Sequence, residues 1–167
     1  AAMGFPAIPG VPLPDGILNP LYEYDFGTEF RYSDVSGVIT IQPPPIRRVL
    51  PTLVPKVDVD GNETAGVASV LHQVPLGTYT GWNTFPSGFF HGRILTNGGS
   101  FIPFARTRAE RLASGDPRPS LEERYGTHDR YVALVRAAAE RLVRGRYLLQ
   151  EDADRLIQEA EASKVLK

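Results

Sequence analysis

The chain has 167 residues, a formal net charge of −1 and 42% hydrophobic residues. This near-neutral balance gives no electrostatic reason to expect nucleic acid or an anionic membrane surface as a partner. The chain has no cysteine, which excludes disulfides, thiolate catalysis and zinc–thiolate sites and is compatible with both the cytosol and export. Because no run of about 18 apolar residues is present, we expect a soluble chain without a membrane span.

The first 50 residues predict an extended, proline-rich strap. All 15 prolines lie at or before Pro119, and the closely spaced ones near the N-terminus block a helix and weaken a central strand. Phe5, Ile8 and Val11 are then available to dock on another surface. "QPPPIRR", residues 42–48, is typical of a short polyproline II spacer, although both stretches are equally compatible with plain connections. The chain also starts without an initiator methionine, so we expect it to be a cut piece of a longer protein.

Residues 51–100 predict a β-hairpin followed by aromatic and glycine-rich loops. Val57 and Val59 lead into Asp60-Gly61-Asn62, residues that tolerate the backbone of a tight hairpin turn, and residues 63–70 lead out and place His72 in the outgoing strand. The acidic residues of this turn resemble a calcium loop superficially, but they lack the spacing of an EF-hand. The sequence therefore favours a hairpin over a metal site.

The stretch "VPLGTYTGWN", residues 74–83, contains the single tryptophan of the chain. Its glycines allow close backbone approach, while Tyr79 and Trp82 supply aromatic surface with polar tips. Two interpretations stay open: the aromatic residues pack in the core or at a junction with another segment, or they line a substrate pocket. With Asn83 and His91, they form the candidate pocket or interface residues.

Residues 101–167 predict a helical region. A first helix is expected from about Phe104 to Ser114, and "PSLEERYG" begins with the capping-box pattern of Ser120 and Glu123. Two longer amphipathic helices follow, at about residues 127–144 and 150–163, with Gly145 ending the first of them. Their apolar stripes predict an antiparallel helical hairpin; the residues of these stripes are Tyr131, Leu134, Val135, Ala138, Leu142, Val143, Ala153, Leu156, Ile157 and Ala160.

No motif completes an active site. The nucleophile elbow G-x-S-x-G is absent, since Ser87, Ser100 and Ser114 each have glycine on one side only. The three histidines are scattered, and none has a partner at metal-ligand spacing. We therefore assign no catalytic residue to this chain and expect neither a metal nor a cofactor.

Several stretches, in order, resemble the C-terminal part of the bacterial alpha/beta hydrolase domain family. They are "FPAIPGV", "LVPKVDVDGNETAGV", "VPLGTYTGWN", "FIPFARTRAERLASGDPRPSLEERY" and "LLQEDADRLIQEAE". The resemblance implies an α+β chain, with strap, β-hairpin and helical hairpin, that forms the C-terminal part of an α/β-hydrolase.

The function that this resemblance implies is serine-dependent hydrolysis of a small acyl or ester substrate. The catalytic serine and histidine would lie in an N-terminal hydrolase segment, which is the expected partner. Departures from the family pattern around "ASVLHQV" and "TFPSGFFHGR" leave the substrate open. The alternative from another class is a non-catalytic module that binds a protein through the aromatic loop and the helical hairpin.

Overall fold

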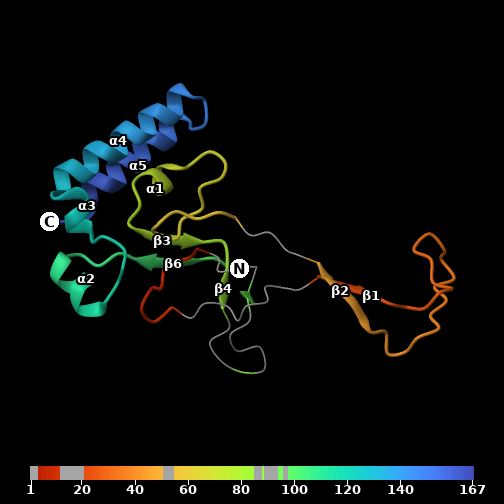
Figure 1. The fold of residues 1–167 in the computed structure, drawn as a ribbon. Coiled ribbons are helices and arrows are strands. Elements are labelled where there is room, and N and C mark those ends of the chain that lie inside the picture. Colours follow the sequence, from red (N-terminus) through yellow and green to blue (C-terminus); the bar gives the residue numbers. More distant parts are fainter. Residues whose placement is uncertain (1–3, 12–20, 51–54, 85–87, 89–93, 96–97) are drawn as a thin grey trace.

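The computed structural model describes residues 4–11, 21–50, 55–84, 88, 94–95 and 98–167. In these residues the chain is a mixed α+β structure in which each sheet is a single antiparallel pair of strands. The helices gather towards the C-terminus, as the sequence predicts (Figure 1). Among the described residues, no helix is both long and apolar enough to cross a membrane.

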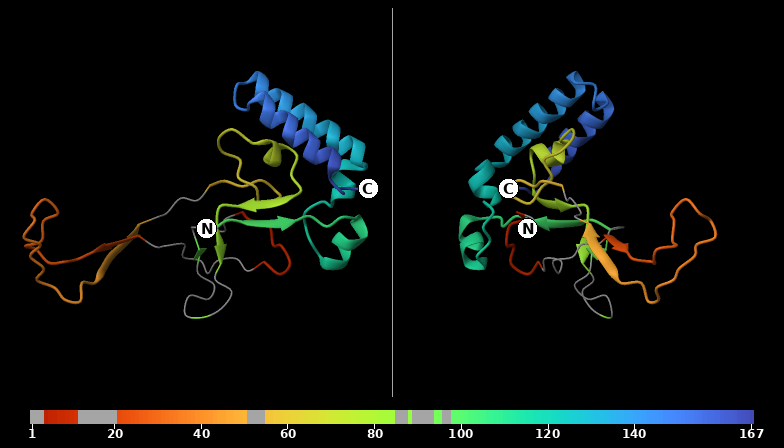
Figure 2. Two further views of the ribbon diagram at one scale, coloured as in Figure 1. Left: turned by 180° about the vertical axis from the view of Figure 1, so that it is seen from behind. Right: turned by 45° about the vertical axis from the view of Figure 1, so that its right-hand side comes forward.

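The core is built on the predicted helical hairpin, which is confirmed. Helix α4 (His128–Arg144) and helix α5 (Gln150–Ala162) lie side by side in Figures 1 and 2. Their antiparallel direction brings the start of α4 against the end of α5, where the imidazole of His128 contacts the carbonyl oxygens of Val165 and Glu161. The buried residues of this core are Val70, Val74, Tyr125, Tyr131, Val135, Ala138, Ala139, Leu142, Ala153, Ile157 and Ala160.

Two details of these helices differ from the sequence expectation. Leu134, placed on the apolar stripe of α4, is 39% exposed, whereas Ala139 is fully buried. The helix ends at Gly145, but this glycine has a right-handed backbone and Arg146 takes the left-handed conformation. A Cβ atom on Gly145 would lie 2.9 Å from the ring of Tyr147, a side chain that is 67% exposed.

Short capped helices join the hairpin to the strands. Helix α3 (Leu121–Tyr125) has the predicted capping box of Ser120 and Glu123. Helix α2 (Arg108–Ser114) starts later than expected, because Thr107 and Glu110 form a second capping box. None of its residues is buried.

The region after the turn at Gly61 is not the predicted hairpin. Within the described residues the predicted pairing is limited to the turn itself: an antiparallel bridge joins Val57 to Glu63, and the N–H of Thr64 donates to the carbonyl oxygen of Lys56 at 3.0 Å. The outgoing segment then forms helix α1 (Val70–Gln73), so His72 lies in a helix and not in a strand. Val70 is buried in the helical core; this tertiary contact overrides the β preference of the valines.

The "VPLGTYTGWN" stretch contains strands where the sequence predicts loops. Strand β3 (Gly77–Thr80) pairs with β6 (Ser100–Pro103), and β4 (Asn83–Thr84) pairs with β5 (Ile94–Leu95). A Cβ atom on Gly77 would lie 2.4 Å from the carbonyl oxygen of Ile102, so this glycine permits the close approach of β3 to β6.

The region predicted as a strap also contains a pair of strands. Strand β1 (Leu21–Tyr24) pairs with β2 (Ile46–Leu50), and the segment between them closes a long loop. Residues 42–45 therefore lead into β2, and residues 46–48 belong to it, so this stretch is not only a spacer. We call residues 21–50 the arm; both figures show it extending away from the helices (Figures 1 and 2).

Candidate functional site

Tyr79 lies in β3 within a cluster of rings that come from separate parts of the chain. Its ring stacks on Phe101 of β6 at a centroid distance of 5.0 Å and contacts the ring of His72 at 5.5 Å. Its backbone N–H donates to the side-chain oxygen of Asn62 at 2.8 Å. Burial raises the pKa of the Tyr79 hydroxyl above its ordinary value. The Tyr79 hydroxyl therefore stays protonated at neutral pH.

Trp82 follows β3 in the sequence, and its ring packs against a different aromatic residue from those that contact Tyr79. Its half-buried ring meets Phe5 edge-to-face at 5.5 Å, so the N-terminal strap docks on this segment of its own chain. The carbonyl oxygen of Trp82 accepts from the hydroxyl of Thr80 at 2.5 Å. Asn83 is exposed, and its side-chain oxygen accepts from the N–H of Thr84 at 2.8 Å. His91 lies outside the described residues.

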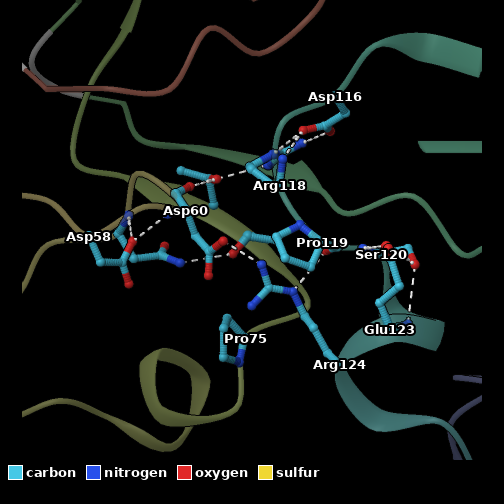
Figure 3. Close-up of polar contacts among 12 residues, drawn as sticks. Asp58, Asp60, Pro75, Asp116, Arg118, Pro119, Ser120, Glu123 and Arg124 are labelled. Carbon is cyan, nitrogen blue, oxygen red and sulfur yellow. Dashed lines mark hydrogen bonds and ion pairs between the residues drawn. The ribbon is translucent and has the colours of Figure 1, made fainter. Parts of the chain in front are cut away.

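A polar network joins the turn at residues 58–62 to β3 and α3 (Figure 3). One carboxylate oxygen of Asp58 accepts from the backbone N–H groups of Asp60 and Asn62, each at 2.9 Å. The amide of Asn62 is 1% exposed and donates to the carbonyl oxygen of Gly77 at 3.2 Å. Asp60 pairs with Arg124 of α3. The side chains that resemble a calcium loop in the sequence thus hold the turn against β3 and α3.

Arg118 is the centre of the network, and sequence reasoning missed it. All the N–H groups of its guanidinium have acceptors: the carboxylate of Asp116 at 2.6 and 3.0 Å, the hydroxyl of Thr78 at 2.8 Å, and the carbonyl oxygens of Ile102 and Pro103 at 2.9 and 3.1 Å. The side chain is 1% exposed. The only sequence signal is the i, i+2 spacing of Asp116 and Arg118, which is too common to identify a buried ion pair.

Electrostatics within this pair favour the charged form of Asp116. Burial on its own raises the pKa of the Asp116 carboxyl, but the hydrogen bonds and charge of Arg118 outweigh burial, and the pKa lies below its ordinary value. No buried side-chain nitrogen or oxygen lacks a hydrogen-bond partner within the part of the chain that the structure describes. The contacts of the network thus join loop, strands and helix to one another.

One serine–histidine contact occurs that the sequence reasoning did not single out. The hydroxyl of Ser69, the residue before α1, lies 2.9 Å from Nδ1 of His72. This is a local i, i+3 contact on the exposed surface, and no carboxylate contacts the imidazole in the described hydrogen bonds and ion pairs. A hydrolytic triad needs such a third group to orient its base.

The other serines considered as nucleophiles have structural partners. The hydroxyl of Ser100 contacts that of Thr80 at 2.7 Å across β3 and β6, and the hydroxyl of Ser114 donates to the carbonyl oxygen of Arg111 at 3.0 Å. Ser87 lies outside the described residues. Neither described serine contacts a histidine.

Two surface hollows lie away from Tyr79 and Trp82. One is an apolar groove of about 310 Å³ between α1 and the loop end of the helical hairpin, lined by Val67, Ser69, Val70, Leu71, Leu142, Tyr147, Leu148 and Leu156. The other is an open hollow of about 540 Å³, lined by His128, Asp129, Val132, Ala133, Arg136, Glu161 and Lys167. Ser69 is therefore among the residues that line the apolar groove.

Comparison with known families gives one match. The model of the alpha/beta hydrolase domain family matches residues 34–158, which is most of the chain and extends from the arm to α5. No curated protein and no solved structure gives a significant match.

Proposed function

We propose, from the premise that this chain belongs to the alpha/beta hydrolase domain family, that it is the C-terminal segment of a serine-dependent hydrolase. Its substrates would be carboxylic esters or related acyl compounds. The observation that carries the proposal is the family match over residues 34–158. The serine and histidine would come from the N-terminal hydrolase segment, here called the catalytic segment.

The chemistry of such an enzyme sets what this chain has to supply. A serine that gives its proton to histidine attacks the acyl carbon, and the alcohol leaves with that proton. Water then hydrolyses the acyl-enzyme, which releases the carboxylic acid and restores the serine, while backbone N–H groups stabilise the oxyanion in both steps. These groups must keep fixed positions, which requires a completed fold around them. We assign that completing role to the strands and helices described above, with Tyr79 and Trp82 at the junction with the catalytic segment or at the edge of its pocket.

The proposal predicts that this chain does not hydrolyse esters by itself. Its only described serine–histidine contact lacks an orienting carboxylate, so release of p-nitrophenol from a short p-nitrophenyl ester should stay at the background rate. Addition of the catalytic segment of a member of the family, produced as a separate polypeptide, should raise the rate above that of either part alone.

Serine-to-alanine replacements test whether one of four serines of this chain acts as a nucleophile. Turnover by the isolated chain that disappears in Ser69→Ala, Ser87→Ala, Ser100→Ala or Ser114→Ala would contradict the proposal, and Ser36→Ala, in the arm, is the matched control. Tight binding of the catalytic segment without any gain in turnover would favour the alternative, a non-catalytic binding module.

A further inference from the structure

Residues 4–11, the N-terminal strap, are anchored to the rest of the chain by two apolar side chains. The ring of Phe5 meets Trp82 edge-to-face at 5.5 Å. A Cβ atom on Gly61 would lie 2.8 Å from the ring of Phe5, so this ring also packs on the backbone of the turn. Ile8 is 6% exposed and supplies a second, buried anchor three residues later. Figures 1 and 2 show the strap, coloured red, beside the β3–β6 pair.

The backbone of the strap does not pair with the surface on which it lies. Within the described residues, both of its backbone hydrogen bonds are internal: the N–H of Ile8 donates to the carbonyl oxygen of Pro6 at 3.0 Å, and the N–H of Val11 donates to that of Ile8 at 3.1 Å. Pro6 and Pro9 restrict the backbone further. These turns and prolines reduce the conformational entropy that the strap loses on docking. Side chains alone thus join the strap to the described chain.

The surface under the strap is held in place by contacts that do not include the strap. The carboxylate of Asp58 accepts from two backbone N–H groups of the turn at residues 58–62, each at 2.9 Å. The side chain of Asn62 joins this turn to β3. The carbonyl oxygen of Trp82 accepts from the hydroxyl of Thr80 at 2.5 Å. We therefore expect this surface to keep its shape when the strap leaves.

We propose that the strap is a reversible cover, in which Phe5 and Ile8 occupy a preformed peptide-binding site at Trp82 and the Gly61 turn. The site takes a proline-rich peptide with an aromatic and an aliphatic anchor three positions apart, since proline-rich segments suit surfaces with aromatic walls. Release of the strap uncovers Trp82, so the strap controls access to this candidate junction or pocket residue. The inference goes beyond the proposed function and does not depend on it, because its test measures binding and not turnover.

Attachment to the same chain keeps the strap in its site. A flexible tether gives a bound segment an effective concentration of about 1 mM. The closed form therefore predominates if the free peptide binds the empty site with a dissociation constant below about 1 mM. A competing peptide has to exceed this effective concentration to displace the strap.

The test opens the site in the full-length chain. The open variant combines Phe5→Ser and Ile8→Ser, which removes both anchors, and Ala7→Ser, at an exposed position of the same strap, is the matched control. Trp82 is the single tryptophan, so its fluorescence reports on this site directly. Helical ellipticity checks that the helical hairpin stays folded, and hydrogen exchange of the β3 amides checks the strand.

The open variant should shift the emission of Trp82 to longer wavelength and increase its quenching by acrylamide, because Phe5 no longer covers the indole. A synthetic peptide of residues 1–11 should reverse this shift, with half-saturation below about 1 mM. The same peptide with Phe5→Ser and Ile8→Ser should have no effect. The wild-type and Ala7→Ser chains should not respond to either peptide at that concentration, since their sites are filled.

Four results would overturn the inference. Unchanged emission in the open variant would mean that Phe5 does not cover Trp82. Loss of protection in its β3 amides would make the strap an integral part of the fold. Failure of the peptide to reverse the shift, or an equal response by the wild-type chain, would exclude a site that the strap fills. A wild-type dimer that the open variant dissociates would mean that the strap docks on a second copy of the chain.

Discussion

At the scale of single residues, Arg118 connects several segments of the fold, although no motif in the sequence indicates this role. It joins the loop before α3 to β3 and β6 through acceptors on Asp116, Thr78 and two backbone carbonyls. Its guanidinium also lies over the ring of Phe104, with its central carbon 5.0 Å from the ring centroid. Removing one partner of a buried ion pair leaves the other charge without compensation.

Arg118→Ala should therefore lower the free energy of unfolding by about 3–5 kcal/mol. Arg118→Lys should also be destabilising, because an ammonium group cannot reproduce the planar set of five donors. Urea titration followed by circular dichroism measures both. Arg108→Ala is the control, since that side chain is 69% exposed and its loss should change stability by less than about 0.5 kcal/mol. A loss below about 1 kcal/mol in Arg118→Ala would show that the network is dispensable.

Replacement of Trp82 distinguishes the two interpretations that the sequence leaves open, packing in the core or at a junction and lining of a substrate pocket. A fully buried tryptophan costs about 3–5 kcal/mol when replaced by alanine, and half-burial against Phe5 should reduce this to about 2 kcal/mol in the isolated chain. If Trp82 also lies at the junction, Trp82→Ala should weaken association with the catalytic segment. If it lines the pocket, the ratio of kcat/KM for bulky over small acyl groups should change instead.

We expect the junction effect. Thermal unfolding, association measurements and kinetics with two substrates on Trp82→Ala distinguish these cases, and Trp82→Phe serves as the conservative control. An association constant unchanged by Trp82→Ala would contradict the junction assignment.

At the scale of elements, Glu123 couples two short helices. It caps α3 through Ser120 and binds Arg111 of α2 at 2.8 and 3.1 Å. The hydrogen bonds from Arg111, followed by those from Ser120, lower the pKa of the Glu123 carboxyl from 4.5 to about 2. A carboxyl with a lower pKa in the folded state stabilises the fold above its unfolded pKa and loses this effect as pH falls through its folded pKa.

The attachment of α2 should consequently weaken between about pH 4.5 and pH 2. Hydrogen exchange of the α2 amides at pH 6 and pH 2.5, corrected for the intrinsic exchange rate, measures this loss. Glu123→Gln should show weaker protection at pH 6 and a smaller change with pH. The same pH dependence in Glu123→Gln as in the wild-type chain would exclude Glu123 as its source.

The helices could be predicted from the sequence because their signals are local. The stripe of Tyr131, Val135, Ala138 and Leu142 identifies the core face of α4 without knowledge of any partner. Strand β3 depends on residues about twenty positions away, since Thr80 lies opposite Ser100 in the register. The pairing of β1 with β2 spans a similar separation. Such contacts leave no periodic pattern in segments of four or five residues.

At the scale of the whole molecule, the sequence identified the aromatic residues of the candidate site but not their surroundings. Tyr79 and Trp82 stand out by size among small neighbours, whereas their partners Phe101, His72 and Phe5 come from three separate segments. The polar network around Arg118 was beyond sequence reasoning for the same reason. The family, in contrast, could be recognised from ordered stretches of sequence, and the match over residues 34–158 confirms it.

The single tryptophan lies between β3 and β4, whereas most of the helical residues of the chain belong to the helical hairpin. Indole fluorescence and helical ellipticity are consequently reporters of different neighbourhoods. If the strands detach before the helices melt, the two signals should give different midpoints in one urea titration of the isolated chain. Coincident midpoints would mean that the contacts of Arg118 and Arg124 join the strands and the helices into one cooperative unit. Binding of the catalytic segment should bring separate midpoints together.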